Sequence, residues 1–207
     1  KPFSNVFFTS IVRDKLGRKM SKSLGNSPDP LDLIAKYGAD GLRFGLMRIA
    51  PTGTDVKFDE KQIEEGKNFA NKLYNAARFR MMQGEASTDP APKFTPVHID
   101  ILSKLKELHA TVAEGLAKYE FNTYTQALYS FFWNEYCSLF LEAVKNDLRD
   151  GDPAVKNATL YTIDTVLRHY LALLSPIMPH IAEELWQSLG FAARYEGKPL
   201  MSTPLPQ

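Results

Sequence analysis

The fold is decided by residues 122–147, which run Asn122-Thr-Tyr-Thr-Gln-Ala-Leu-Tyr-Ser-Phe-Phe-Trp-Asn-Glu-Tyr-Cys-Ser-Leu-Phe-Leu-Glu-Ala-Val-Lys-Asn-Asp147. The stretch lacks glycine and proline, so nothing in it interrupts a helix. Its aromatic side chains are Tyr124, Tyr129, Phe131, Phe132, Trp133, Tyr136 and Phe140. These side chains fall on several faces of a helix, which predicts a helix that is covered on more than one side.

The sequence around this stretch indicates further helices and short connections. Helical patterns cover residues 99–118, the segment from Asp152-Pro153 to Leu174, and residues 180–189. Helices joined by short loops are typical of a bundle. We therefore expect a helix bundle over residues 98–207, incomplete at its C-terminal end.

The N-terminal half predicts a different organisation. Residues 5–13 are rich in β-branched and aromatic residues and predict a strand, followed by a tight turn over residues 14–17. Helices are expected over residues 29–37, 40–49 and 59–83, the last with a capping box formed by Asp59 and Gln62. The fold class is thus mainly α. Four regions are predicted: residues 1–26, a helical connector over 27–83, a Pro/Gly-containing linker over 84–97, and the bundle over 98–207.

Composition excludes several classes of protein. The chain has 207 residues, is 44% hydrophobic and carries a net charge of +1, which excludes a disordered chain and a generally basic nucleic-acid binder. Cys137 is the single cysteine, so no internal disulfide and no multi-thiolate zinc site can form. The four histidines stand apart without metal-ligand spacing, and we expect no metal site. No apolar run is long enough to predict a membrane helix.

Charge is concentrated in one short segment. Residues 13–26 have a net charge of +4, whereas the rest of the chain sums to −3. An anionic ligand is therefore expected at this segment, which we call the basic loop.

The basic loop contains Lys19-Met20-Ser21-Lys22-Ser23, followed by Leu24-Gly25-Asn26. Two lysines three residues apart, with hydroxyl groups between and after them, supply the cations and donors that phosphate groups need. Cations that reach the phosphates in the transition state would accelerate the loss of pyrophosphate from a nucleoside triphosphate. The alternative is a solvated Lys/Ser-rich surface loop.

The same five residues resemble the second signature of class I aminoacyl-tRNA synthetases. The similarity extends to residues 37–44, Tyr-Gly-Ala-Asp-Gly-Leu-Arg-Phe, which resemble the subgroup for valine, isoleucine and leucine. Residues 53–58 and 68–79 resemble the valyl-tRNA synthetase family in particular. Residues 133–137, Trp-Asn-Glu-Tyr-Cys, and 176–186, Pro-Ile-Met-Pro-His-Ile-Ala-Glu-Glu-Leu-Trp, resemble the anticodon-binding domain of that subgroup.

The resemblance implies roles for residues of the basic loop. Lys22 is expected to contact the ATP phosphates and stabilise the transition state of adenylate formation, and Lys19 is expected to assist it. Met20, Ser21 and Ser23 complete the expected ATP-binding set. Residues 27–83 correspond to the connector that contacts the tRNA stem, and residues 98–207 to most of the anticodon-binding domain.

The resemblance also implies an activity for a larger protein. Such an enzyme activates valine with ATP, accompanied by Mg²⁺, and transfers it to tRNA(Val). The first class I signature, His-x-Gly-His, does not occur in the sequence, so we expect this chain alone to be inactive and to retain no bound cofactor. We expect a cytoplasmic monomer. The alternatives are an isoleucyl- or leucyl-tRNA synthetase, a free-standing RNA-binding helical module and a purely structural bundle.

The predicted helix over residues 59–83 carries a polar face with Asn71, Asn75, Arg78 and Arg80, the last nearer its apolar stripe. These four residues are candidate tRNA contacts, because amide and guanidinium groups can bind bases and phosphates. A solvated helix face is the alternative. The aromatic cluster at Trp133–Tyr136 could stack on unpaired bases or form part of the core.

Overall fold

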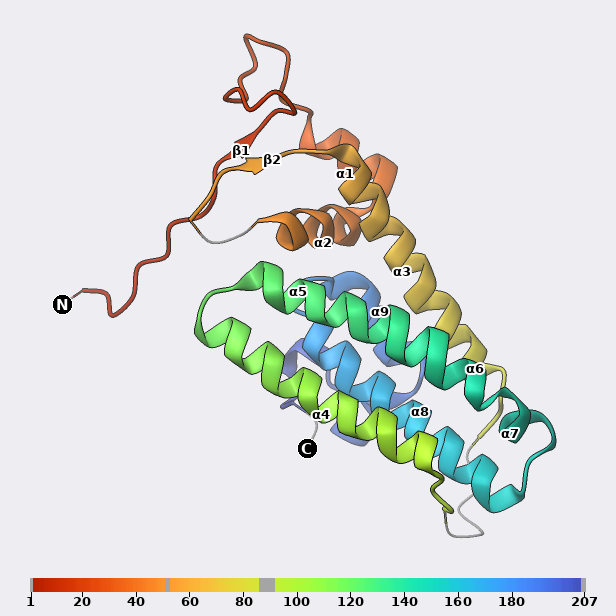
Figure 1. Ribbon diagram of the computed structural model, residues 1–207. Coiled ribbons are helices and arrows are strands. Elements are labelled where there is room, and N and C mark those ends of the chain that lie inside the picture. The colour runs from red at the N-terminus through yellow and green to blue at the C-terminus, as the bar shows by residue number, and fades with distance from the viewer. Residues whose placement is uncertain (1, 51–52, 86–91, 206–207) are drawn as a thin grey trace.

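The computed structural model describes residues 2–50, 53–85 and 92–205 and confirms a mainly α fold. The first part contains β1 (Val12–Arg13), α1 (Pro30–Tyr37), α2 (Ala39–Ile49), β2 (Val56–Lys57) and α3 (Glu60–Met81). The bundle contains α4 (Pro96–Ala117), α5 (Phe121–Ser130), the π-helical segment Phe131–Phe140, α6 (Leu141–Ala143), α7 (Lys145–Asp150), α8 (Pro153–Leu174) and α9 (Pro179–Ser188). Two 3₁₀ turns follow, at Phe191–Tyr195 and Leu200–Ser202. In Figure 1 the basic loop lies at one end of the molecule, and α3 runs from the base of that loop toward the bundle.

Aspartate caps set the starts of three helices, as the sequence predicts. The side chains of Asp29, Asp59 and Asp152 accept hydrogen bonds from main-chain N–H groups two residues further on, at 2.8, 3.2 and 2.8 Å. The predicted capping box at Asp59 is wrong for Gln62, whose side chain should accept a hydrogen bond from the main-chain N–H of Asp59. The side-chain oxygen of Gln62 is buried and has no hydrogen-bond partner among the described residues.

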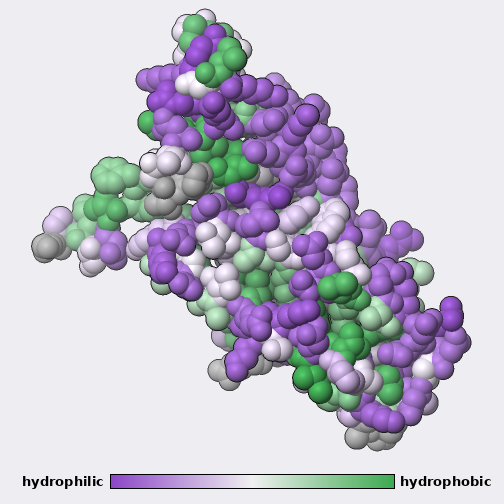
Figure 2. Space-filling model, viewed as in Figure 1, coloured by the Kyte–Doolittle hydropathy of each residue, from purple (hydrophilic) through white to green (hydrophobic). Residues whose placement is uncertain are grey.

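The N-terminal strand is shorter than predicted. β1 pairs in parallel with β2, with Val12 opposite Val56 and Arg13 opposite Lys57. Since β2 supplies only two residues, the preceding residues have no neighbouring strand and remain irregular. This segment exposes apolar side chains, among them Phe8 at 82%, and it projects from the body in Figure 2.

Helices α2 and α3 approach each other through glycines. A Cβ atom on Gly66 would lie 2.4 Å from the carbonyl oxygen of Gly41, and one on Gly45 would lie 2.7 Å from the carbonyl oxygen of Gln62. Only residues without a side chain permit this separation of the two backbones. The connector is therefore a tightly packed pair of helices.

The aromatic stretch is not the single helix that its sequence predicts. It forms α5, then a π-helical segment, then α6, and it breaks at Val144 before α7. The N–H of Leu141 bonds to the carbonyl of Tyr136, five residues back. The hydrophobic pattern could not reveal this, because a buried helix has apolar residues on every side whichever hydrogen-bonding period it adopts.

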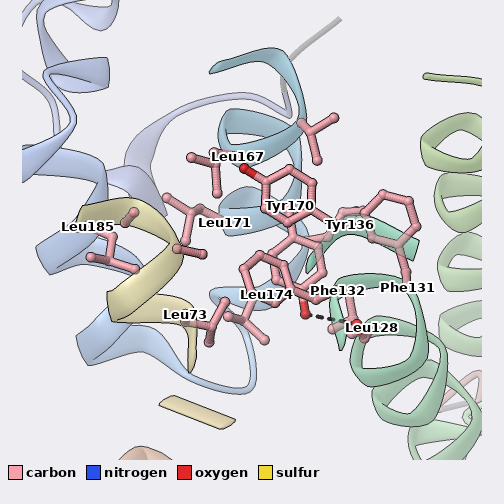
Figure 3. Close-up of a cluster of buried hydrophobic side chains, with 14 of the residues drawn as sticks. Leu73, Leu128, Phe131, Phe132, Tyr136, Leu167, Tyr170, Leu171, Leu174 and Leu185 are labelled. Carbon is pink, nitrogen blue, oxygen red and sulfur yellow. Dashed lines mark hydrogen bonds between the residues drawn. The ribbon is translucent and has the colours of Figure 1, made fainter. Parts of the chain in front are cut away.

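Aromatic side chains from this stretch form the centre of the core. The ring of Phe132 lies 4.7 Å from that of Tyr170 in α8 and 5.9 Å from that of Phe69 in α3, measured between centroids. The hydroxyl of Tyr170 donates to the carbonyl of Leu128 at 2.9 Å, as the dashed line in Figure 3 marks. The expected cover on more than one side is thereby confirmed.

Helix α4 begins three residues before its predicted start because His98 closes its first turn. The imidazole Nδ1 accepts from the main-chain N–H of Thr95 at 3.0 Å, and Nε2 lies 2.8 Å from Oγ1 of Thr159 in α8. Since Nδ1 accepts a main-chain proton, the neutral ring carries its own proton on Nε2 and donates it to Thr159. His98 thus joins α4 to α8.

Candidate functional sites: the basic loop and the α3 groove

The basic loop is held at its base by the carboxylate of Asp14, which is 8% exposed. One oxygen accepts from the main-chain N–H groups of Leu16 and Arg18 at 3.0 and 2.8 Å. The other accepts from the guanidinium of Arg18 at 2.7 Å and from the amide of Asn26 at 3.0 Å. The Asn26 hydrogen bond, with those from Arg18, lowers the pKa of Asp14 to about 2.

Asn26 closes the loop across twelve residues. Besides its bond to Asp14, its amide donates to the carbonyl of Lys19 at 3.2 Å and its oxygen accepts from the N–H of Ser21 at 2.9 Å. Ser21 Oγ lies 3.2 Å from Ser23 Oγ and accepts from the N–H of Leu24 at 3.3 Å. The backbone of the signature residues is therefore organised by side chains of the loop itself.

This arrangement leaves both signature lysines facing solvent. Lys19 and Lys22 are exposed, and within the described part of the chain neither of them forms an ion pair. Ser23 is exposed, while Met20 and Ser21 are partly buried. The loop presents two unneutralised ammonium groups and a hydroxyl on a fixed base, which is suited to an anionic ligand with several phosphate oxygens.

The second candidate site is a hollow along α3. This feature, which we call the α3 groove, has a volume of about 490 Å³. From α3 it is lined by Asn68, Asn71, Lys72, Asn75, Ala76 and Phe79, and from the facing segments by Trp133, Cys137, Leu141, Glu142 and Lys145. A polar edge of three amides thus faces a largely apolar floor, which resembles the mixture of surfaces that a nucleobase presents.

Cations and aromatic rings alternate from Lys72 and Trp133 in the α3 groove to Tyr129 and Arg48 beside it. Lys72 Nζ lies 4.2 Å from the ring centroid of Trp133, whose ring stacks on Tyr129 at 5.5 Å. The guanidinium of Arg48 in α2 lies 4.2 Å from the centroid of Tyr129. The indole of Trp133 is therefore engaged by protein groups, and Lys72 adds a positive charge to the groove.

The structure separates the four predicted tRNA-binding residues. Asn71 and Asn75 line the α3 groove, and Arg78 is exposed on the same helix without lining it. Arg80 is buried at 8% exposure. It donates to the carboxylate of Asp164 at 2.6 and 2.8 Å and to the carbonyl of Gly84 at 2.7 Å.

Sequence reasoning missed several residues of these sites. Asn68 and Lys72 also line the groove. Asn68 lies three residues before Asn71, and Lys72 lies three residues before Asn75, which is a helical signal that could have found them. No local signal identifies Asp14 and Asn26 as partners. Across the described ranges, no three His, Cys, Asp or Glu side chains group in a way that could hold a metal ion. None of the described helices is long and apolar enough to cross a membrane.

Two family models match the chain. Residues 99–207 match the anticodon-binding domain of tRNA ligases, and residues 1–59 match the class I tRNA synthetases for isoleucine, leucine, methionine and valine. The bundle thus corresponds to the first model, and the second covers the basic loop, α1 and α2.

Curated relatives are similar over the whole chain. The valine–tRNA ligase of Parabacteroides distasonis is 47% identical over 100% of this chain, and that of Bacteroides thetaiotaomicron is 46% identical over 99%. The valine–tRNA ligase of Nitratidesulfovibrio vulgaris is 45% identical over 91%. In each case the chain spans 22–23% of the relative's length.

A solved structure shares the fold. The LeuRS chain of a LeuRS–tRNA–LeuAMS ternary complex from Agrobacterium radiobacter K84 aligns with a TM-score of 0.74 at 22% identity, over 100% of this chain and 25% of that one. With the fold and sequence in agreement, the resemblance to valyl-tRNA synthetases is confirmed, and the chain belongs to the tRNA ligase family that is defined by this anticodon-binding domain.

Proposed function

We propose that this chain acts as part of a valine–tRNA ligase, in which it supplies the phosphate-contacting loop and the surface that recognises the anticodon. The observation that carries the proposal is the pair of exposed lysines, Lys19 and Lys22, on a loop whose base is closed by Asp14 and Asn26. Similarity to valine–tRNA ligases over the whole chain supports valine rather than isoleucine or leucine. It also disfavours a free-standing RNA-binding module.

In the first reaction, the carboxylate of valine attacks the α-phosphorus of ATP and pyrophosphate leaves. Negative charge grows on the bridging oxygen and on the leaving group, where an ammonium group stabilises the transition state more than the ground state. Lys22 has this role in our proposal, and Lys19 assists it. Met20, Ser21 and Ser23 shape the loop and add donors. Mg²⁺ accompanies ATP as part of the substrate, bound chiefly by its phosphates.

The test is the substitution Lys22→Ala in the ligase that contains this chain. We expect the rate of valine-dependent pyrophosphate exchange to fall by about 100-fold, while the KM for ATP changes little, because the lost contact belongs to the transition state. Lys106→Ala, an exposed lysine of α4, is the matched control. An unchanged exchange rate in Lys22→Ala would refute the role of the loop.

We further propose that the α3 groove binds an unpaired base of the tRNA(Val) anticodon. The amides of Asn71 and Asn75 can each donate to and accept from the edge of a base, the pairing that an asparagine makes with adenine. Arg78 and Lys72 add positive charge for the neighbouring phosphates. Arg80 is not part of this proposal, because Asp164 already occupies its guanidinium.

The groove is tested by titrating the chain with tRNA(Val) and with a transcript whose anticodon is replaced. Asn75→Ala should weaken binding of tRNA(Val) roughly tenfold and reduce the difference between the two RNAs. Asn134→Ala, an exposed asparagine of the π-helical segment outside the groove, should leave both affinities unchanged. Equal losses for both RNAs would contradict base recognition and would point to a phosphate contact alone.

Other properties of the ligase follow from the same proposal. We propose that it acts as a monomer in the cytoplasm, and that this chain alone does not activate valine. Measurable pyrophosphate exchange by the isolated chain would contradict the last statement.

A further inference from the structure

Two charged side chains of α2 bind the turn between α8 and α9. The carboxylate of Asp40 accepts the main-chain N–H of Ile181 at 2.6 Å and that of His180 at 3.3 Å. These N–H groups belong to the first turn of α9, which has no cap from its own preceding residue, Met178. Asp40 therefore caps α9 from another helix, and its negative charge lies at the positive end of the α9 dipole.

The second side chain, Arg43, binds the other end of the same turn. Its Nε donates to the carbonyl of Ile177 and its Nη2 to the carbonyl of Pro176, each at 2.8 Å. These carbonyls follow the C-terminus of α8 at Leu174, where positive charge is favoured. Asp40 and Arg43, three residues apart on one helix, thus bind the α9 and α8 sides of the turn. We call these four hydrogen bonds the α2 clamp.

The α2 clamp joins two segments that lie far apart in the sequence. Asp40 and Arg43 belong to residues 37–44, and their partners belong to residues 176–186, more than 130 positions further along. Neither segment contributes to the lining of the α3 groove. The clamp is therefore a contact between connector and bundle.

The turn between α8 and α9 is also held by the hydrophobic core. Ile177, Met178 and Ala182 are 2%, 0% and 0% exposed, and they belong to the main hydrophobic core. Hydrophobic burial therefore contributes to holding the turn in place, in addition to the hydrogen bonds from α2. The clamp adds a defined orientation of α2 relative to α8 and α9, because its hydrogen bonds are made to fixed main-chain groups.

We propose that Asp40 and Arg43 are positioning residues for the transfer of the amino acid to tRNA. This inference rests on the proposed function. The α3 groove and the basic loop lie at different ends of the connector, and α2 packs on α3 through the glycine contacts described above. By fixing α2 against the bundle, the clamp sets the orientation in which a tRNA held at the groove reaches the catalytic centre. In such reactions, a small displacement of a contact far from the reacting atoms lowers the rate considerably.

The experiment compares two reactions of the ligase that contains this chain. Pyrophosphate exchange measures adenylate formation without tRNA, and steady-state aminoacylation measures use of tRNA(Val). For Asp40→Ala we expect kcat/KM for tRNA to fall about tenfold, as for the loss of one charge-assisted hydrogen bond, with exchange within about twofold of wild type. Arg43→Met should lower kcat/KM for tRNA to a similar degree and should likewise leave pyrophosphate exchange almost unchanged. Asp32→Ala, an exposed aspartate of α1, is the control and should change neither reaction.

Two outcomes would contradict the positioning role. Unchanged kcat/KM for tRNA in Asp40→Ala, or equal losses in both reactions, would show that the clamp has no positioning role. If Asp40→Ala lowers the amount of folded protein, Asp40→Asn and Arg43→Lys decide, because each retains one hydrogen-bonding group, and both must then show the same selective loss for tRNA in a smaller degree. A wild-type ligase that does not charge tRNA(Val) would contradict the proposed function itself, which is a distinct result.

Discussion

Arg80 in α3 and Asp164 in α8 form a two-point salt bridge, with Nε to Oδ1 at 2.6 Å and Nη2 to Oδ2 at 2.8 Å. The two side chains are 10% and 17% exposed. A third hydrogen bond joins Nη1 to the carbonyl of Gly84, just after the end of α3. The C-terminal end of α3 is thus fixed to the bundle by Arg80, a residue that its sequence position predicts to contact tRNA.

The first prediction concerns Arg80→Met. Removal of the guanidinium leaves the Asp164 carboxylate partly buried without its counterion, so the free energy of unfolding should fall by about 3 kcal/mol. Urea denaturation of the chain measures this. Arg80→Met combined with Asp164→Leu should recover part of the loss, because the uncompensated charge is then gone. A variant of unchanged stability that binds tRNA(Val) poorly would instead restore Arg80 as an RNA contact.

The second prediction concerns the glycine contact between α2 and α3. Gly66→Ala should destabilise the chain by about 2 kcal/mol, because the new methyl group would lie 2.4 Å from a main-chain oxygen that cannot move without shifting α2. Gly115→Ala in α4 is the control. There the added carbon meets its nearest neighbour at 3.4 Å, and alanine favours a helix. Thermal unfolding of both variants gives the comparison, and equal effects would contradict the packing argument.

The sequence predicts features whose causes are local. The aspartate caps of α1, α3 and α8 and the turn at residues 14–17 depend on neighbours within four positions, and the structure has them all. The residues of the basic loop likewise show its resemblance to the second class I signature without knowledge of the fold.

Features that depend on distant partners could not be predicted. The guanidinium of Arg80 pairs with a carboxylate 84 residues away, and the caps of α9 come from Asp40, 141 residues before Ile181. The composition of residues 5–13 favours an extended chain and predicts a long strand, whereas the pairing depends on how many residues β2 supplies. The π-helical segment is invisible for a related reason, since burial on all sides removes the periodicity that would distinguish it.

The third prediction concerns Asn26, whose side chain makes three bonds inside the basic loop. Asn26→Ala should raise the pKa of Asp14 from about 2 toward its usual value near 4, because the Asn26 hydrogen bond is the largest cause of the lowering. A carboxyl group with a lowered pKa stabilises the folded state at neutral pH and loses that contribution as the pH falls toward 2. NMR titration of the Asp14 carboxyl carbon measures the shift.

The same substitution should slow adenylate formation in the ligase, since Lys19 and Ser21 lose the bonds that hold their backbone. Ser27→Ala, next along the chain, is the matched control. A pKa that does not move would show that the remaining contacts from Leu16 and Arg18 are sufficient to stabilise the carboxylate.

The last prediction is a loss of stability in mild acid. Burial lowers the pKa of His169 to about 4, with further lowering by Arg168 and His109, and burial also lowers the pKa of His109 and of His98. His109 Nε2 lies 3.1 Å from His169 Nδ1, a hydrogen bond that requires one of the two nitrogens to be unprotonated.

These histidines ionise near pH 6.5 in the unfolded chain and at lower pH in the folded one, so the unfolded state binds protons first. Their contribution to stability is complete above about pH 6.5 and is lost as the pH falls toward 4. The free energy of unfolding should therefore be lower at about pH 5 than at pH 7, by on the order of 1–2 kcal/mol for His169 alone. Urea denaturation at the two pH values measures the difference. His169→Asn should reduce it, whereas His180→Asn, at an exposed position of α9, should not. A pH dependence that is the same in His169→Asn and wild type would show that carboxyl groups, rather than the histidine pair between α4 and α8, limit stability in acid.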